Sequence, residues 1–131
     1  MGLLQEMSTE ECLGLLAASV VGRAAICTPE GPHVVPVNYA VDGDSIVFRT
    51  TPYSVLGTYA WAGDIAFEVD QIDLATHRGW SVVARGRGEM VEDVEEIEEI
   101  RWGHEPKPWA EGARPLFVRL RWRELTGRRI V

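Results

Sequence analysis

The side chains best suited to binding chemistry lie in one short stretch, Arg49-Thr50-Thr51-Pro52-Tyr53-Ser54. It offers a guanidinium, two threonine hydroxyls and a serine at the expected start of a helix, and several such donors converging on one point bind a phosphate group. The same pattern also fits a strand followed by an ordinary helix that Ser54 caps. The stretch therefore predicts either a phosphate-binding turn or a purely structural one.

Catalysis by side chains alone is not predicted. The three histidines, His33, His77 and His104, fall in expected turns or loops, far apart in the sequence and without metal-ligand spacing. There is no Gly-x-Ser-x-Gly motif and no Walker loop, and the Gly-Arg-Gly at 86–88 lacks the third glycine and the following helix of a dinucleotide fingerprint. If the protein does chemistry, we expect a bound cofactor to carry the difficult step.

Composition limits the partners that the protein can be expected to bind and the compartment in which it is expected. The chain has 131 residues and a mass of 14.6 kDa, which fits a single domain over residues 1–131. Its net charge of −7 argues against nucleic acids and anionic membranes as partners. We recognise no secretory signal, and the apolar stretches are shorter than the ~20 residues of a membrane span. We expect a cytoplasmic protein in which Cys12 and Cys27 are reduced core residues.

Hydrophobic periodicity predicts a mainly β chain. A capping box at Ser8 and Glu11 predicts a helix over residues 9–18. Its expected apolar face holds Leu13, Leu15, Leu16 and Val20. Strands are expected at 21–28, 34–41, 45–50, 65–70, 79–91 and 116–125. A short helix is expected at 54–61, and an acidic helix follows with a buried stripe of Val91, Val94, Ile97 and Ile100. Six antiparallel strands with few helices predict a closed or nearly closed barrel.

Two of the expected strands carry further patterns. One face of the strand 79–91 holds Trp80, Val82, Ala84, Gly86 and Gly88. The small residues on that face predict the close approach of another backbone or of a flat ligand. The last strand presents a row of arginines, Arg119, Arg121 and Arg123. We expect this row to meet Glu68 and Asp70, or solvent, rather than to form a basic patch.

Read in order, several segments resemble the flavin-binding split β-barrel family of pyridoxamine 5′-phosphate oxidase-like proteins. The segments are GRAA (22–25), GPHVVPVNY (31–39), IVFRTTP (46–52), FEVD (67–70), GWSVV (79–83) and the closing TGRRI (126–130). The resemblance covers nearly the entire chain. It implies an antiparallel split β-barrel of Greek-key type, in which two chains pair and flavin mononucleotide (FMN) lies in a cleft at their interface.

The resemblance also implies which residues meet the cofactor. Along the flavin ring it implies contacts from Pro36, Val37, Asn38 and Tyr39, chiefly through their backbone. The alternative for this segment is a buried strand with an edge proline and no ligand. Those implied at the phosphate are Arg49, Thr50, Thr51, Ser54 and Val55. Those implied near the ring from elsewhere are Trp80 and Ser81 on the long strand and Trp109 in a covering loop, although tryptophans in a small domain are more often core and interface anchors.

At one position the chain departs from the family. A lysine or arginine usually follows the Thr/Ser position and contacts the phosphate, whereas Ser54 is followed by Val55 and Leu56. The only lysine in the chain is Lys107, far away in the sequence. The loss of one cation from a site for a dianion weakens binding by ~1–3 kcal/mol.

We therefore expect an FMN-binding split-barrel protein that acts as a flavin-dependent oxidoreductase on a small molecule, and not a genuine pyridoxamine phosphate oxidase. Two alternatives stay open: a binding protein or reductase for the deazaflavin F420, and a cofactor-free dimeric binding protein with a degenerate flavin site. A homodimer is also expected because so small a barrel can hardly bury all of its apolar material alone. That material includes Trp61, Trp102, Trp109 and Trp122.

Overall fold

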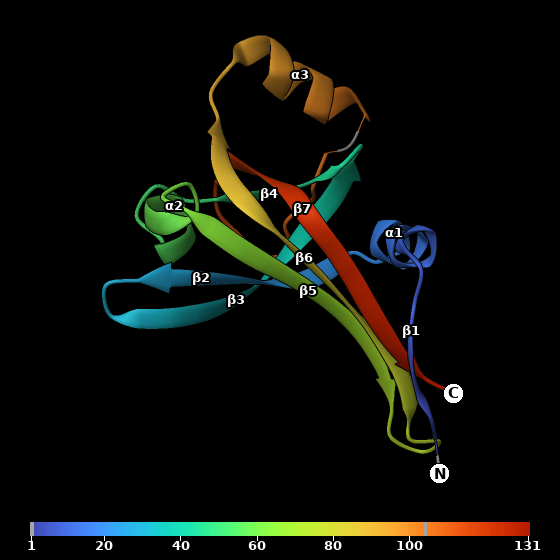
Figure 1. The fold of residues 1–131 in the computed structure, drawn as a ribbon. Helices are drawn as coiled ribbons and strands as arrows, with labels where there is room; N and C mark the ends of the chain where they lie inside the picture. The colour runs from blue at the N-terminus through green and yellow to red at the C-terminus, as the bar shows by residue number, and fades with distance from the viewer. Residues whose placement is uncertain (1, 104) are drawn as a thin grey trace.

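The computed structural model describes residues 2–103 and 105–131 and contains one sheet and three helices (Figure 1). The helices are α1 (Thr9–Ala18), α2 (Val55–Tyr59) and α3 (Val94–Gly103). The strands are β1 (Leu4–Glu6), β2 (Val21–Thr28), β3 (Gly31–Asp42), β4 (Ser45–Thr50), β5 (Asp64–Asp73), β6 (Arg78–Val91) and β7 (Leu116–Ile130). His104, which is predicted to lie in a loop, falls outside the described residues. None of the described helices is long and apolar enough to cross a membrane.

The strands form one antiparallel sheet that closes on itself. Its order is β1-β7-β4-β3-β2-β5-β6, and β6 pairs again with β7. The ring therefore runs from β7 through β4, β3, β2 and β5 to β6, while β1 pairs with the end of β7. The prediction of a mainly β, antiparallel, nearly closed barrel is confirmed.

The ends of β5, β6 and β7 extend beyond the ring as an arm, and both chain termini lie at its far end (Figure 1). β6 and β7 pair along almost their whole lengths, from Gly79 and Ile130 on the arm to Val91 and Phe117 beneath α3. The predicted strand 116–125 stops too early, because residues 126–130 continue the ladder with β6 and their last three residues also pair with β1. His33, predicted in a turn, instead lies within β3 opposite Ile26.

The helix α1 confirms the capping box and part of its predicted apolar face. The Ser8 hydroxyl accepts a hydrogen bond from the Glu11 amide at 3.1 Å, and the Glu11 carboxylate accepts one from the Ser8 amide. Leu16 is fully buried and Leu15 partly buried as predicted, and Cys12, four residues before Leu16, is buried with them. The prediction is wrong at Leu13, which lies off this stripe, and at Val20, which lies beyond the end of the helix; both are exposed.

The prediction that Cys27 is a core residue is wrong, whereas Cys12 is buried as expected. On β2 the buried positions are Gly22, Ala24 and Ile26. Because side chains alternate between the two faces of a strand, Cys27 points away from the core.

The helix α3 packs on the outer face of the barrel through its second half. Ile100 is fully buried against Val47, Val91 and Phe117, and Ile97 adds partial cover. Val94 does not belong to the buried stripe, because it lies in the first turn, where its side chain is 71% exposed. The predicted stripe is therefore wrong at this position.

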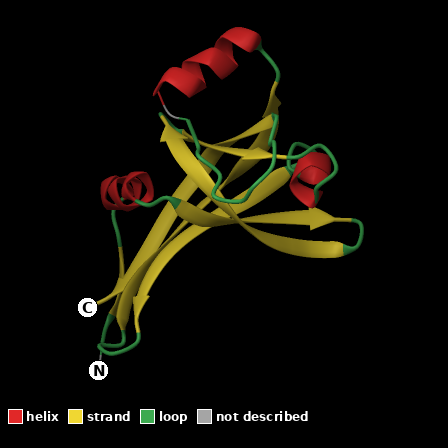
Figure 2. Ribbon diagram, turned by 180° about the vertical axis from the view of Figure 1, so that it is seen from behind, coloured by secondary structure: helices red, strands yellow, loops and turns green. Residues whose placement is uncertain are grey.

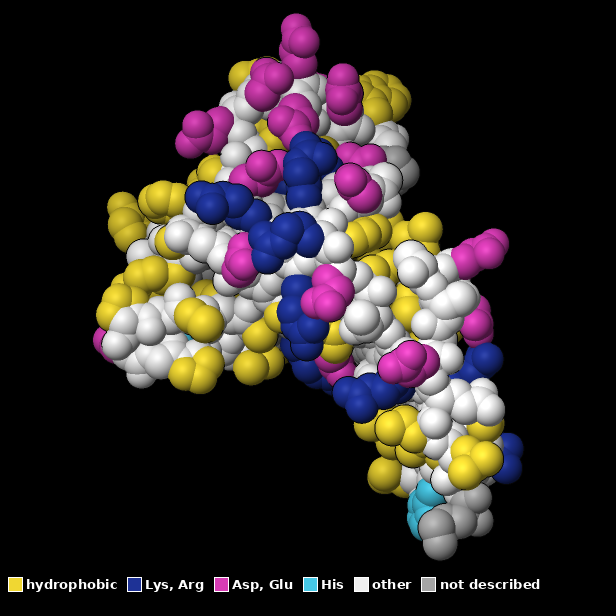
Figure 3. Space-filling view, viewed as in Figure 1, with side chains coloured by type: hydrophobic (Ala, Val, Ile, Leu, Met, Phe, Trp, Pro, Cys, Tyr) yellow, Lys and Arg dark blue, Asp and Glu magenta, His cyan; other side chains and the backbone are white. Residues whose placement is uncertain are grey.

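The arginines of β7 are paired with acidic residues, but not with the predicted ones. Arg119 is buried and contacts both Asp42 on β3 and Glu96 on α3 at 3.0 Å. Arg121 pairs with Glu89, and Arg123 pairs with Asp64. Glu68 and Asp70 instead face Arg23 on the neighbouring strand β2. Basic and acidic groups are accordingly interleaved along this face, with no basic patch (Figure 3).

The small residues of β6 admit backbone from neighbouring segments. A Cβ atom on Gly86 would lie 1.9 Å from the carbonyl oxygen of Arg121, and one on Gly88 would lie 1.8 Å from that of Ala60. Of the two predicted reasons for these glycines, the close approach of another backbone is therefore the one that the structure bears out.

We predict that Gly88→Ala destabilises the protein by at least ~1–3 kcal/mol, because the new methyl group collides with a carbonyl that no side-chain rotation can move. Gly14→Ala is the matched control: nothing lies within 4 Å of its added Cβ, and alanine in the helix α1 should stabilise by ~0.5–1 kcal/mol. Urea unfolding of both variants measures the difference, and equal stabilities would contradict the packing described for β6.

Candidate functional site

The twelve predicted site residues fall into three groups in the structure. The turn between β4 and α2 holds Thr50, Thr51, Ser54 and Val55. The strand β3 and the outer face beside it hold Pro36, Val37, Asn38, Tyr39, Arg49 and Trp109. The arm holds Trp80 and Ser81. Each group has its own surroundings.

In the turn between β4 and α2, the hydroxyl groups bond to one another and to the backbone. Ser54 caps α2: its hydroxyl accepts a hydrogen bond from the Gly57 amide at 2.9 Å and lies 2.8 Å from the Thr51 carbonyl oxygen. The hydroxyls of Thr50 and Ser54 lie 2.7 Å apart. Val55 packs against the core. The turn is therefore well ordered without a ligand, and it contains no cationic side chain.

Arg49 points away from this turn, because neighbouring residues of a strand face opposite sides. Its guanidinium lies over the Phe117 ring, 4.8 Å from the centroid. It donates to the Arg114 carbonyl oxygen at 3.0 Å and pairs with Glu105 at 3.4 Å. Both partners belong to residues 105–115, a loop that we call the strap. Figure 2 shows the strap after α3, crossing in front of the sheet.

Asn38 on β3 also contacts the strap. Its Oδ1 atom accepts a hydrogen bond from the Trp109 amide at 2.8 Å, whereas the Trp109 indole is 75% exposed. An N–H group can only donate, so the atom facing it must be the amide oxygen. The other amide atom, Nδ2, is buried and has no hydrogen-bond partner among the described residues. An unsatisfied buried donor of this kind costs ~1–3 kcal/mol.

Tyr39, the next residue, turns its side chain into the barrel. The ring is 5% exposed and meets Phe67 edge-on, with centroids 4.8 Å apart. Its hydroxyl donates to the Leu16 carbonyl oxygen at the end of α1. Burial raises the pKa of Tyr39 to about 12. Any ligand contact on the open side of β3 at this position would therefore come from the backbone, and Pro36 and Val37 offer only apolar side chains.

A groove of about 610 Å³ begins at Tyr39, the residue after Asn38, and Asn38 itself does not line it. Tyr39, Ala40 and Val41 of β3 line it, and the strap contributes Glu105 and Lys107. The ends of α1 and α3 complete its walls. The volume falls within the range of small-molecule sites.

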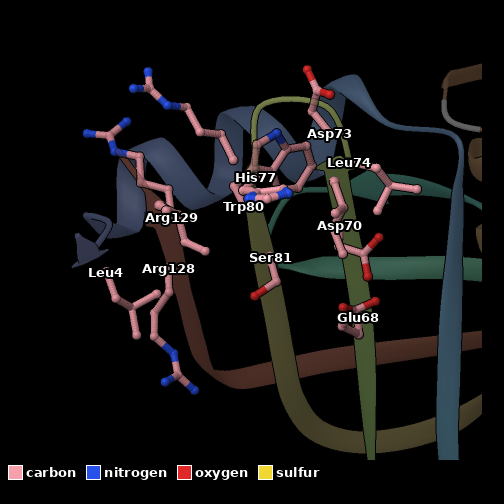
Figure 4. A pocket seen from close by; sticks show the side chains of 14 residues that line it. Leu4, Glu68, Asp70, Asp73, Leu74, His77, Trp80, Ser81, Arg128 and Arg129 are labelled. Carbon is pink, nitrogen blue, oxygen red and sulfur yellow. The ribbon is translucent and has the colours of Figure 1, made fainter. Parts of the chain in front are cut away.

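Trp80 and Ser81 line a different cavity, on the arm, with a volume of about 420 Å³ (Figure 4). It shares no residue with the groove that begins at Tyr39. Glu68 and Asp70 project from β5 along one side of it, and Arg128 and Arg129 lie on the other side (Figure 4). Burial, followed by the hydrogen bond and the charge of Asp70, raises the pKa of Glu68, and Arg23 opposes that shift. The apolar part of the lining consists mainly of Leu4, Ile72, Leu74 and Ile130.

Sequence reasoning missed the residues of the strap that hold Arg49. Glu105 contributes a side chain, but Arg114 contributes only its carbonyl oxygen. A backbone acceptor leaves no trace in residue type, and a loop rich in proline and glycine has no periodicity from which its path can be read. No sequence signal available here would have identified these contacts.

Known proteins resemble this chain over nearly its full length. The family model for pyridoxamine 5′-phosphate oxidase matches residues 8–129. An uncharacterized protein of Mycobacterium tuberculosis, Rv0080, is 30% identical over 131 residues, covering 96% of this chain and 85% of that protein. A conserved protein of unknown function from Corynebacterium diphtheriae superimposes with a TM-score of 0.82 at 30% identity, covering 98% of both chains. The FAD binding protein from Mycobacterium smegmatis superimposes with a TM-score of 0.74 at 28% identity, covering 97% of this chain and 98% of that chain. The split β-barrel fold predicted from the sequence is thus confirmed.

The raised pKa of Tyr39 predicts a loss of stability in alkali. Between pH 10 and about pH 12 the unfolded tyrosine ionises while the folded one stays protonated, so the free energy of unfolding should fall as the pH rises through this window. Tyr39→Phe should remove that part of the fall, and should cost ~0.5–1.5 kcal/mol at neutral pH by losing the hydrogen bond to Leu16. Denaturant unfolding across this pH range tests it. Tyr53→Phe, at a side chain that is 97% exposed, is the control and should change neither quantity.

Proposed function

This chain belongs to the pyridoxamine 5′-phosphate oxidase-like family, and on that premise we propose that it binds the FMN moiety, as FMN or as part of FAD, for flavin-dependent redox chemistry on a small molecule. Flavin binding is supported by the likeness to the FAD binding protein from Mycobacterium smegmatis. FMN and FAD share the ring, the ribityl chain and the first phosphate, so one site can serve either.

The observation that carries the proposal is the amide of Asn38. A flavin ring carries carbonyl oxygens on its pyrimidine edge, and the buried Nδ2 atom is a donor without an acceptor. It lies on the strand that the family resemblance assigns to the ring, one residue before the start of a groove large enough for a small molecule. The ring end of a flavin therefore fits the residues that are present.

The phosphate end fits less well. The hydroxyls of Thr50 and Ser54 bond to each other, and Val55 stands where the family usually has a cation. Arg49 is half-buried and faces the strap rather than the turn. We infer that the ring supplies most of the affinity and that the phosphate adds little.

When bound, a flavin accepts or delivers a hydride or single electrons. The chain would hold the ring in position along β3, and the strap would exclude water from it. Among the described residues, no group of three or more His, Cys, Asp or Glu side chains is placed to hold a metal ion.

Absorbance of the purified protein, followed by titration with FMN, FAD and riboflavin, tests the proposal. Flavin absorbance in the purified protein, or saturable binding of added flavin, is the expected result. A colourless protein that binds none of the three would overturn it. In that case, binding of a deazaflavin would favour the F420 alternative, and no binding at all would favour the cofactor-free protein.

We predict that Val55→Lys tightens FMN binding about tenfold, because it restores a cation beside Thr50 and Ser54. Riboflavin, which lacks the phosphate, should bind the variant no better than the parent. Fluorescence quenching measures both affinities, and Val55→Met controls for the longer side chain. Equal gains for the two ligands would show that the phosphate does not lie at this turn.

We also propose that the protein is a homodimer. Large apolar side chains are exposed together on the arm, with Leu4 61%, Ile72 67% and Leu74 83% exposed. Charges of both signs lie beside them, so two copies of this face can be complementary across a two-fold axis. Of the four tryptophans expected at an interface, Trp61, Trp102 and Trp109 are exposed and Trp122 is half-buried.

Light scattering at micromolar concentration should give twice the 14.6 kDa chain mass. Ile72→Glu should shift the mass toward one chain, because it would bury an unpaired charge in the interface. Val94→Glu is the control: its side chain is equally exposed, on α3, and it should leave the mass unchanged. A monomeric parent protein would contradict the proposal.

A further inference from the structure

Few polar contacts join the strap to the outer face of β3 and β4. The Trp109 amide donates to Asn38, and Arg49 donates to the Arg114 carbonyl and pairs with Glu105. Three of its eleven positions, 106, 108 and 115, are prolines, which have no N–H group to bond with. The strap therefore lacks the ladder of backbone bonds that secures the strands beneath it.

With the strap in place, only one of the two polar atoms of the Asn38 amide has a hydrogen-bond partner among the described residues. Its oxygen has a partner in Trp109, but its Nδ2 atom is buried without one. An unsatisfied buried donor costs free energy for as long as it has no acceptor. A ligand that supplies the missing acceptor is favoured by the same amount.

The chemistry of the amide limits the choice of ligand. A primary amide presents an acceptor and a donor side by side, and its complement is a group with an N–H next to a carbonyl, as in a cyclic imide. Such an imide would take over the Asn38 oxygen from Trp109 and satisfy Nδ2 at the same time. The pyrimidine edge of a flavin or a deazaflavin is a cyclic imide of this kind.

Resting on the proposed function, we propose that the side-chain amide of Asn38 recognises the imide edge of the ring, and that the strap must release it first. The groove that begins at Tyr39, which the strap helps to line, gives the ring an approach to β3 next to Asn38 in the chain. Asn38 is then a specificity-determining residue that acts through its side chain, in addition to the backbone contacts expected along β3.

Asn38→Asp tests the donor. The aspartate keeps an acceptor for the Trp109 amide but loses the N–H, so riboflavin, which probes the ring without the phosphate, should bind about tenfold to a hundredfold more weakly at pH 8. A protonated aspartate regains one donor, and burial raises the pKa of such a carboxyl. Affinity should therefore recover as the pH is lowered toward 5. Loss of affinity that does not recover would indicate a merely structural role and overturn the inference.

Two controls accompany this titration. Gln5→Glu makes the same chemical change at an exposed residue of β1, and it should bind riboflavin like the parent. Charged groups on the elements packed near Asn38 include Arg49 on β4, Arg101 on α3, and Glu105, Lys107 and Arg114 on the strap. They are the same in the parent, so the parent titrated in parallel removes their contribution.

A second test uses the parent protein alone, so its outcome does not depend on whether a variant folds. 3-Methylriboflavin carries a methyl group in place of the imide N–H, and it should bind at least about tenfold more weakly than riboflavin. Equal affinities, or an Asn38→Asp variant that binds riboflavin like the parent, would overturn the inference and leave the proposed function standing. A parent that binds 5-deazariboflavin but no flavin, and loses that binding on imide methylation, would keep the inference and overturn the flavin proposal. A parent that binds none of these rings would overturn both.

Discussion

The barrel closes along β7, and the positions of the other strands follow from that closure. This one strand pairs with β1, β4 and β6, and without it the sheet would be open at both sides of the ring. Where β6 meets β7, Gly86 lets the Arg121 carbonyl group come closer than a side chain would allow. Two further glycines fit the helices against the sheet: Gly88 accommodates the Ala60 carbonyl group after α2, and Gly127 accommodates the Cys12 side chain of α1. The fold therefore depends on these glycines as well as on its apolar core.

Closure also creates the outer face on which the candidate site lies. Arg119 and Arg49 both stand on this face, but they are held with different strength. Arg119 is 4% exposed and contacts two carboxylates at 3.0 Å, and breaking a buried ion pair of this kind costs ~3–5 kcal/mol. Arg49 has one carboxylate at 3.4 Å and one carbonyl group. The helix α3 is thus anchored by two close ion pairs, whereas Arg49 holds the strap that follows it through one longer ion pair and one hydrogen bond.

Much of the fold could be predicted from the sequence, because alternation, turns and the capping box are local signals. The strand β1 is not predicted, since its three residues are all exposed and show no alternation of buried and exposed positions. The end of β7 is not predicted either, because Gly127 and its polar neighbours interrupt the alternation of apolar residues. The site was harder to predict. The bonds from Trp109 to Asn38 and from Arg49 to Arg114 join residues 71 and 65 positions apart, and each uses a backbone atom that has no residue-specific signature. Residue types could indicate Asn38 and Arg49 as candidates, but not that one strap covers both.

We propose that the flavin ring binds at β3 and displaces the strap from Asn38. Hydrogen exchange of the Trp109 amide, followed by NMR with and without saturating FMN, measures this displacement. We expect faster exchange at Trp109 when FMN is bound, because the amide loses its acceptor, with no change along the arm at Trp80. Unchanged exchange at Trp109 together with a change confined to the arm would contradict the account.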